Sequence, residues 1–224
     1  MKYVAFLDIL GFKEKLKSLE QQEAKQFISE FSSVAYQEWE KFNSSSLNGY
    51  IVSDSFIIYS NDISTNALND IVKIVDKICK EEFSKNSILI RGAISKGSFD
   101  KLEAIELSTL SKGLIVGQAY IDAYLLEGTV KATGIVLSEE VYQDIEMESM
   151  CDQDIFKENN RGDTYYVYRY LSLSYLLEKE NLKKFVSLAS KSKWIPHYYN
   201  TLYFALKNEK SESMIDQFFI NLFD

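Results

Sequence analysis

The chain has 224 residues, 46% of them hydrophobic, and a formal net charge of −8. This length and composition predict one domain with an appendage rather than two full domains. The negative charge argues against a nucleic acid as the main partner, because binding its backbone needs a basic face. It leaves room for a small anionic ligand, since Mg²⁺ or Mn²⁺ can mask the charge of a triphosphate.

The histidine and cysteine content narrows the chemistry, and the lack of targeting segments narrows the location. The single histidine, His197, leaves little room for histidine catalysis, so any metal chemistry should use oxygen ligands. The two cysteines, Cys79 and Cys151, fit neither a disulfide framework nor a zinc site. The sequence shows no signal peptide and no long uncharged apolar run, so we expect a cytoplasmic protein without a membrane partner.

Strands and helices are predicted to interleave along the chain. An apolar run predicts a buried strand over residues 2–9, with a tight turn at Gly11 before a helix. Further helices are predicted over 21–42, 67–83 and 119–127, after Ser138, and from Ser172 onward with a break at Pro196. Strands are predicted over 88–95, 134–137 and 164–171, and a hairpin over 49–60. The hairpin argues against a purely parallel sheet, so we expect an α+β fold with a mixed, mainly antiparallel, ferredoxin-like sheet covered by helices.

Two carboxylates stand where a strand ends or turns. Asp8 closes the first strand, and Asp54 lies at the reversal of the hairpin, between two apolar segments. A charge in such a place needs a partner or a metal, because burying it bare is costly. If the strand and the hairpin are neighbours, the two aspartates could share one or two divalent ions. Their spacing alone leaves a simpler role open, as turn formers or helix caps.

Five segments follow one another in an order that a known family shares. They are FLDILGF at 6–12, Ser53-Asp54-Ser55, RGAISKG at 91–97, GQAYIDAYLLE at 117–127 and GIVLSEEVY at 134–142. Together they resemble the class III nucleotidyl cyclases, whose first metal motif is similar to the first segment and whose second metal aspartate lies at a hairpin. The resemblance covers residues 3–170. It implies a cyclase domain over 1–171. Residues 172–224 have no counterpart in it; their helical pattern with large apolar side chains predicts a helical extension that packs on the domain or on a dimer partner.

The resemblance implies a two-metal mechanism. Asp8, Asp54 and the Ile9 carbonyl would hold two divalent cations, Mn²⁺ or Mg²⁺, which help the ribose 3′-hydroxyl attack the α-phosphate and steady the departing pyrophosphate. The N–H groups of Leu10, Gly11 and Phe12 would bind the phosphates. Members of the family are head-to-tail dimers, so a homodimer with composite active sites is implied.

Two positions depart from the purine-specific members of the family. Those cyclases read the base with a lysine four residues before the second metal aspartate and with an Asp or Thr three residues before the helix glycine; here Tyr50 and Leu114 stand there. A tyrosine at the first position is typical of the Pycsar pyrimidine cyclases of bacterial anti-phage defence. The resemblance then implies UTP, or else CTP, as substrate and a cyclic nucleotide that activates a separate effector. The alternative is that Tyr50 is an ordinary strand aromatic.

The family's transition-state pair, an Asn and an Arg on one helix, is replaced by Ile121 and Leu125. If the protein is active, another cation must stabilise the developing charge. The candidates are Arg91, which we expect to be catalytic, Lys96, which we expect to bind substrate, and Lys131.

A further cation completes the expected substrate site. Arg161 is the nearest match to the family's triphosphate-binding lysine. Each of these cations could instead be a solvated surface charge.

The alternative function is a catalytically silent cyclase-fold module that binds a nucleotide or another protein. Another alternative is a guanylate or diguanylate cyclase, but the segment around Asp54 lacks the Gly-Gly-Asp/Glu-Glu/Asp-Phe hairpin that a diguanylate cyclase needs.

Overall fold

The computed structural model of the protein describes residues 1–102, 114–148, 155–160, 163–178, 180–191, 195–206 and 220. Its strands are β1 (Lys2–Ile9), β2 (Leu47–Val52), β3 (Ser55–Ser60), β4 (Ile90–Gly97), β5 (Asp100–Leu102), β6 (Leu114–Val116), β7 (Ile135–Leu137), β8 (Ile155–Asn160) and β9 (Asp163–Tyr168). Its helices are α1 (Phe12–Lys17), α2 (Gln21–Phe42), α3 (Thr65–Asn86), α4 (Gln118–Glu127), α5 (Glu139–Met147), α6 (Leu173–Leu177), α7 (Asn181–Lys191) and α8 (Ile195–Leu206).

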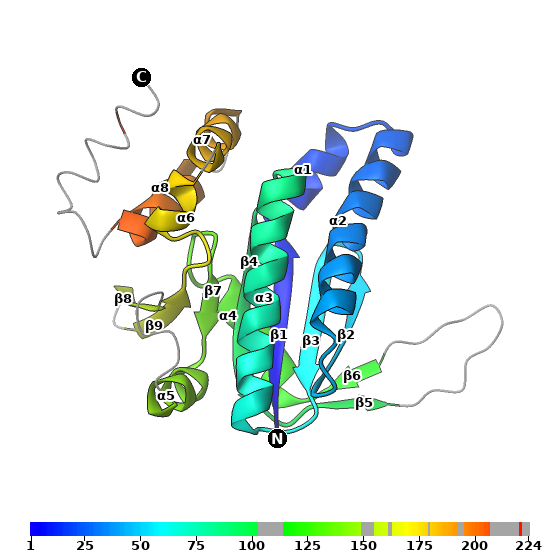
Figure 1. The fold of residues 1–224 in the computed structure, drawn as a ribbon, viewed down its shortest axis with the longest axis vertical. Helices are drawn as coiled ribbons and strands as arrows, with labels where there is room; N and C mark the ends of the chain where they lie inside the picture. The colour runs from blue at the N-terminus through cyan, green and yellow to red at the C-terminus, as the bar shows by residue number, and fades with distance from the viewer. Residues whose placement is uncertain are drawn as a thin grey trace.

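One sheet of seven strands organises the domain, in the order β2-β3-β1-β4-β7-β9-β8. The apolar strand β1 lies inside it and pairs antiparallel with both β3 and β4. The β4–β7 pair is parallel, and β7–β9 and β8–β9 are antiparallel. The expected α+β fold, with a mixed and mainly antiparallel sheet covered by helices, is confirmed (Figure 1).

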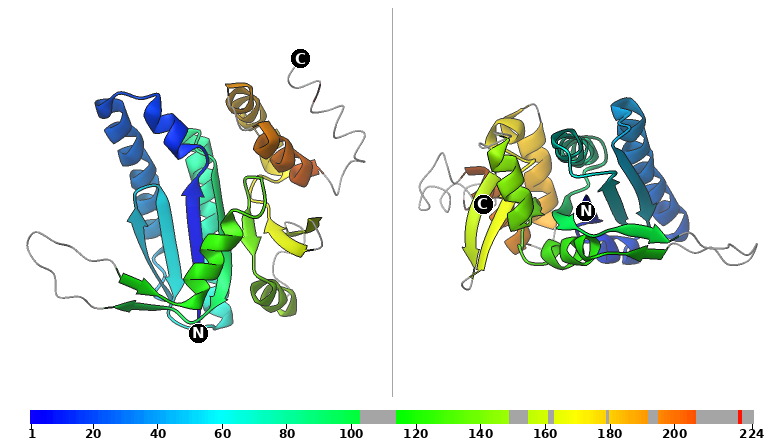
Figure 2. Two further views of the ribbon diagram at one scale, coloured as in Figure 1. Left: turned by 180° about the vertical axis from the view of Figure 1, so that it is seen from behind. Right: turned by 90° about the horizontal axis from the view of Figure 1, so that it is seen from below.

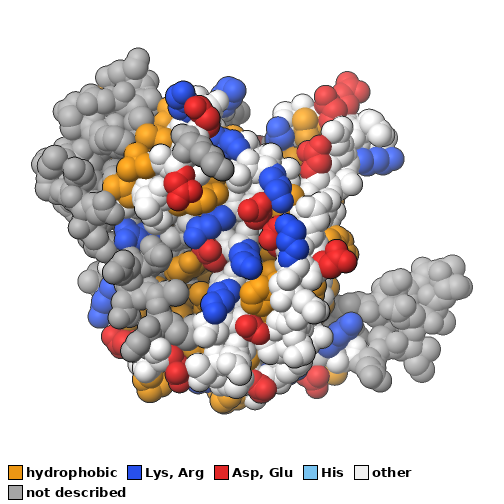
Figure 3. Space-filling view, viewed as in Figure 1, with side chains coloured by type: hydrophobic (Ala, Val, Ile, Leu, Met, Phe, Trp, Pro, Cys, Tyr) orange, Lys and Arg blue, Asp and Glu red, His pale blue; other side chains and the backbone are white. Residues whose placement is uncertain are grey.

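The two faces of the sheet carry different layers. Helices α2 and α3 cover one face and α4 covers the other, as the view from below shows (Figure 2). Side chains of β1 alternate between them because successive residues of a strand point to opposite faces: Ala5 and Leu7 join the core under α3, whereas Val4 and Phe6 join the smaller core under α4. On the outside of the helical layer, basic and acidic side chains are interspersed (Figure 3).

Local signals explain where the helices begin. A capping box of Glu20 and Glu23 starts α2, and the Ser64 hydroxyl accepts a hydrogen bond from the Ala67 N–H at the start of α3. Ser138 caps α5 in the same way, as expected from the sequence, by accepting from the Val141 N–H.

The C-terminal helices α6, α7 and α8 pack on the same core as the sheet. Phe185 and Leu202 are completely buried in the core that α3 covers. Arg169 donates to the Phe204 carbonyl at 2.7 Å, at the end of α8. The expected break at Pro196 is wrong in detail, because this proline lies in the first turn of α8, where its missing N–H removes no helical hydrogen bond. The division at 171/172 stays a prediction.

Three strands were not expected from the sequence. The β5–β6 hairpin forms a separate two-stranded sheet, and β8 adds an edge to the main sheet. None of the helices in the described ranges is both long and apolar enough to cross a membrane.

Candidate functional site

The site is built around the carboxyl end of β1. The alternation of that strand places Asp8 on the α4 side of the sheet, together with Val4 and Phe6. Asp8 pairs in register with Ser55 of β3 on one side and with Arg91 of β4 on the other. Its side chain is 19% exposed, so the carboxyl group is partly withdrawn from water.

Asp54 reaches this point from the β2–β3 turn. Val52 and Ser55 close the hairpin, so the turn consists of Ser53 and Asp54, and Ser53 adopts a left-handed conformation with φ of 58°. Asp54 therefore directly precedes the residue that pairs with Asp8. Burial, the Asp54 carboxylate and a second carboxylate, Glu127, raise the pKa of Asp8 to about 6, although Arg91 acts in the opposite direction. The structure thus brings the two predicted aspartates together.

A buried ion pair borders the two aspartates. Arg91 Nη2 lies 3.4 Å from Asp8 Oδ2, while Arg91 Nε contacts Glu127 Oε1 more closely. Glu127 is the last residue of α4, and only 9% of its side chain is exposed. The sequence analysis did not assign Glu127 a role. The signal that could have found it is an acidic residue that directly follows two leucines at the end of a mainly apolar helix.

The donors at this point fit a divalent cation that is shared with a ligand. Asp8 and Asp54 offer hard carboxylate oxygens, and the Ile9 side chain is buried in the opposite core, so only its carbonyl could contribute. Within the described residues, no group of three or more His, Cys, Asp or Glu side chains is arranged to hold a metal ion. Two carboxylates suffice for Mg²⁺ when substrate phosphates and water supply its other ligands.

The turn after β1 supplies part of the expected phosphate contact. Gly11, at the start of α1, has φ of 75°, a conformation that glycine adopts without strain. The Leu10 N–H, which we expected to donate to a phosphate, instead donates to the Leu89 carbonyl at 2.9 Å. This leaves the N–H groups of Gly11 and Phe12 as the candidates.

Tyr50 lies on β2, on the same side of the sheet as Asp8. Its ring packs beside that of Tyr59, with ring centroids 6.0 Å apart, and Lys101 Nζ lies 5.8 Å from its centre. Burial raises the pKa of the Tyr50 hydroxyl, as do the nearby Tyr59 and Tyr120. The hydroxyl oxygen is buried, and it has no hydrogen-bond partner among the described residues. It is a neutral group able to bond with a ligand, provided that the ligand reaches it.

Among the described residues, neither Lys96 nor Lys131 forms an ion pair with the two aspartates. Lys96 lies on the opposite face of the sheet, where its Nζ is 2.6 Å from Asp144 Oδ2 of α5 and 5.7 Å from the Tyr3 ring centre. Lys131 is exposed. Arg161, Cys151 and the side chain of Leu114 lie outside the described residues.

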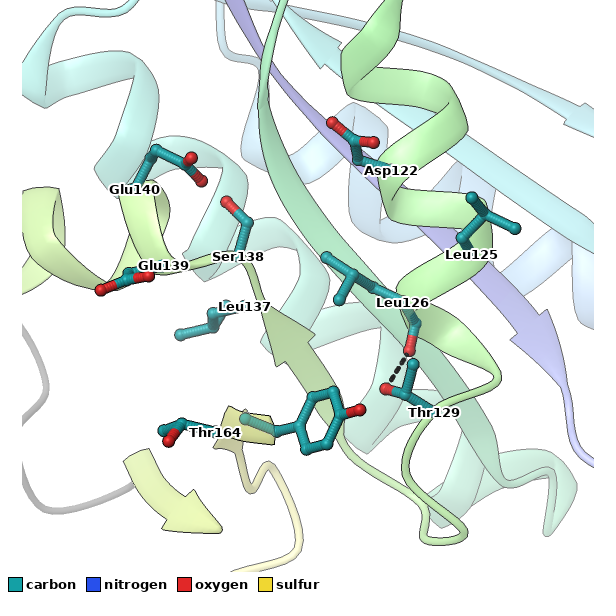
Figure 4. A pocket seen from close by; sticks show the side chains of 10 residues that line it. Asp122, Leu125, Leu126, Thr129, Leu137, Ser138, Glu139, Glu140 and Thr164 are labelled. Carbon is teal, nitrogen blue, oxygen red and sulfur yellow. Dashed lines mark hydrogen bonds between the residues drawn. The ribbon is translucent and has the colours of Figure 1, made fainter. Parts of the chain in front are cut away.

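Helix α4 presents an apolar surface to solvent. Ile121, Tyr124 and Leu125 are 48%, 56% and 62% exposed. Beside them a cavity of about 330 Å³ opens between α4, the start of α5 and β9. Figure 4 shows its walls, with Asp122 and Leu125 on one side and Glu140 on the other. Ile121 and Leu125, the positions of the family's transition-state pair, thus lie on the open surface of the domain.

Comparisons with known proteins agree with this architecture. No protein-family model and no curated protein sequence matches the chain. Among solved structures, it is similar to the adenylyl cyclase CyaB from P. aeruginosa (TM-score 0.54, 19% identity, covering 74% of this chain and 92% of that one). It is also similar to the guanylate cyclase domain of RhGC from Catenaria anguillulae in complex with GTP (TM-score 0.56, 16% identity, 74% and 94% covered). A dimeric guanylyl cyclase domain of RhoGC from Blastocladiella emersonii gives a TM-score of 0.57 at 16% identity, with 74% and 92% covered.

Proposed function

We propose that this protein, whose fold is that of class III cyclase domains, is a pyrimidine nucleotidyl cyclase. It converts UTP, or as second choice CTP, into the 3′,5′-cyclic monophosphate and pyrophosphate. The observation that carries the proposal is the meeting of Asp8 and Asp54 at the end of β1, because two partly buried carboxylates in contact call for a cation between them.

In this proposal the residues of one protomer hold the triphosphate. Asp8 and Asp54, with the Ile9 carbonyl, are the ligands of two divalent cations, Mn²⁺ or Mg²⁺. Bound there, the cations supply charge stabilisation at the α-phosphate and at the departing pyrophosphate. The N–H groups of Gly11 and Phe12 donate to phosphate oxygens, and Arg91 lies beside Asp8, where positive charge stabilises the transition state.

The pyrimidine preference rests on Tyr50. Its buried hydroxyl lacks a partner among the described residues, and a buried polar group without one costs free energy, so a base that bonds to it gains affinity. A tyrosine ring is also bulkier than the tip of a lysine, so it should shorten the base pocket and favour a one-ring base. The Tyr59 ring packs beside that of Tyr50, with ring centroids 6.0 Å apart, and the Tyr50 hydroxyl is buried, so a base must displace neighbouring side chains to reach it.

A second copy of the chain completes the site in this proposal. The exposed apolar residues of α4 form a surface that a homodimer would bury. The RhoGC domain, to which this chain is similar, is described in one solved structure as a non-canonical dimer and in another as monomeric, so the proposed homodimer rests on the exposed surface of α4. Composite sites would place Asp8 and Asp54 of one protomer opposite Tyr50 of its partner. Arg161 would contact the triphosphate and Lys96 would act indirectly, through its pair with Asp144.

The cellular role proposed here is second-messenger synthesis in anti-phage defence, in the cytoplasm. The cyclic nucleotide would activate a separate effector. The resemblance to the Pycsar cyclases supports this role.

A catalytically silent module that binds a nucleotide or another protein is the second candidate. It is favoured by the apolar Ile121 and Leu125, which cannot stabilise charge, on a surface suited to protein contact. The paired aspartates favour the enzyme, because a silent module has no need of two carboxylates that repel each other.

One experiment separates the two candidates. The purified protein is incubated with each of the four NTPs and Mn²⁺, and the products are identified by mass spectrometry. The enzyme yields a cyclic monophosphate that disappears in Asp8→Asn and Asp54→Asn but not in Glu30→Gln, which removes an exposed charge on α2. Absence of any cyclic product with the wild-type dimer, together with retained nucleotide binding by calorimetry, would establish the silent module instead.

A further inference from the structure

Glu127 is a buried carboxylate close to the two aspartates but separated from them by a guanidinium. It ends α4, which packs across β1 and β4 on the Asp8 side of the sheet. Its negative charge contributes to the raised pKa of Asp8, which places it within electrostatic reach of that carboxyl group. Three carboxylates therefore converge at the end of β1, and one cation of the described chain, Arg91, lies among them.

Arg91 is shared unequally between its two acidic neighbours. Its distance to Asp8, 3.4 Å, is longer than the usual charge-assisted contact of about 2.7–2.9 Å. Its contact with Glu127 is closer, although the two atoms meet without hydrogen-bond alignment. Arg91 is thus held mainly by α4 and only loosely by Asp8.

The contact between Arg91 and Glu127 affects whether Asp8 can bind a cation. A guanidinium free of Glu127 would turn to Asp8 and take both carboxylate oxygens in a forked contact. It would then occupy the oxygens that a metal needs, and its positive charge would repel a divalent cation across a poorly solvated site. With Glu127 present, the charges of Arg91 and Glu127 cancel locally, and Arg91 contacts a single oxygen of Asp8, Oδ2, at 3.4 Å.

We infer that Glu127 is a positioning residue that holds Arg91 on α4, so that Asp8 and Asp54 remain available to a divalent cation. The inference rests on the proposed function, since it concerns the cation site assigned there. Glu127 itself is not a ligand in this scheme, because its carboxylate is engaged with Arg91. The position of α4 on the sheet therefore affects the cation affinity of residues that belong to two other elements.

The test measures Mn²⁺ affinity without nucleotide, by electron paramagnetic resonance of free Mn²⁺, in variants whose folding is checked by circular dichroism. Glu127→Gln should bind Mn²⁺ about tenfold or more weakly, comparable to loss of a residue that supports a metal ligand. The double variant Arg91→Met/Glu127→Gln should recover affinity to within about threefold of wild type, because the competing guanidinium is gone. Glu127→Asp keeps the charge but shortens the reach, and it should also weaken binding. Glu30→Gln is the matched control on a distant helix and should bind as wild type does.

Each outcome has a separate meaning. Wild-type affinity in Glu127→Gln would overturn the inference while leaving the cation site in place. Wild-type affinity in Glu127→Asp alone would show that charge suffices and would overturn the positioning role. If Glu127→Gln does not fold, weak binding by the double variant overturns the inference by itself. If the wild type binds no Mn²⁺ even when a non-hydrolysable nucleoside triphosphate is added, or Asp8→Asn and Asp54→Asn bind it equally well, both the cation site of the proposed function and this inference fail.

Discussion

Asp8 at the end of β1 and Asp54 in the β2–β3 turn lie in contact on one face of the sheet, and burial together with the Asp54 carboxylate raises the pKa of Asp8 to about 6. The two groups destabilise each other when both are ionised. Such an arrangement favours binding of a cation at the expense of the stability of the cation-free protein.

The first prediction follows from the repulsion between the carboxylates of Asp8 and Asp54. Asp8→Asn should lower cyclase kcat/KM at least about 100-fold, because it removes a proposed cation ligand. The same change should raise the free energy of unfolding of the metal-free protein by ~1 kcal/mol at pH 8. Since the pKa of Asp8 is raised on folding, the wild type loses stability as the pH rises through about 6, and the Asn variant does not. Urea unfolding in chelator at pH 4.5 and pH 8 measures the effect, and equal stability differences at the two pH values would contradict it.

A second prediction concerns Glu82 on α3, the helix that packs on the face of the sheet opposite the aspartates. Its side chain is completely buried, it accepts a hydrogen bond from Asn86, and burial raises its pKa to about 8. A carboxyl group with a raised pKa stabilises the fold below its unfolded pKa, and that contribution is lost as the pH rises through about 8. Glu82→Gln should therefore flatten the stability profile between pH 5 and pH 9 and raise the unfolding free energy at pH 9 by about 1 to 3 kcal/mol.

The control for that prediction is Glu81→Gln on the same helix. Glu81 is partly exposed and pairs with Lys85 at 2.8 Å, so its removal should change the unfolding free energy by less than ~1 kcal/mol. A pH profile of Glu82→Gln parallel to that of the wild type would show that Glu82 does not titrate in this range.

Much of the fold could be predicted because its signals are local. The apolar run of β1, the helical spacing of α2 and the hairpin around Asp54 lie within single segments, and the structure agrees with each. Strand β8, Ile155–Asn160, could not be predicted, since its polar sequence IFKENN shows no alternation and it forms only by pairing with β9. The short β5 and β6 strands likewise depend on each other across residues 103–113.

For the candidate site, the sequence predicted the backbone position of residues but not the partners of their side chains. The sequence predicted that Asp8 ends a strand and that Asp54 lies at a hairpin turn, and the structure has them there, whereas side-chain partners required the tertiary structure. Lys96 is instructive, because it lies five residues after Arg91 on one strand, and alternation alone puts the two on opposite faces. The pairing of Arg91 with Glu127 depends on how α4 packs across the sheet, which no short sequence pattern contains.

A third prediction concerns assembly. Leu125→Glu, on the exposed apolar surface of α4, should convert a dimer into a folded monomer and abolish activity. Light scattering at micromolar concentration measures the mass. A fully active monomer would rule out composite sites.

Recovery of activity on mixing two impaired variants tests whether the active sites are shared between protomers. The structure places Arg91 beside Asp8 within one chain, so these residues belong to the same half of a site. Mixing Asp54→Asn with Tyr50→Ala should restore roughly a quarter of wild-type activity, because half of the dimers are mixed and each has one intact site of two. Mixing Asp54→Asn with Asp8→Asn should restore none.

The last prediction is the choice of base. We expect kcat/KM to be highest for UTP and second for CTP, with ATP and GTP poor substrates. Tyr50→Phe removes only the hydroxyl, so it should lower kcat/KM for UTP by about 10-fold or more while leaving the ring that shortens the pocket. Tyr50→Ala removes both and should reduce the discrimination against purines.

The stability of Tyr50→Phe helps to distinguish a Tyr50 hydroxyl that binds the base from an ordinary strand aromatic. The hydroxyl is buried without a partner among the described residues, so Tyr50→Phe should stabilise the ligand-free protein, by ~1 kcal/mol. A hydroxyl kept for a ligand lowers stability and raises affinity, and the two effects should appear together in one variant. If Tyr50→Phe stabilises the protein but keeps wild-type kcat/KM for all four NTPs, the hydroxyl does not contact the base. If ATP or GTP is the best substrate of the wild type, the pyrimidine assignment is wrong even where the cation site proves correct.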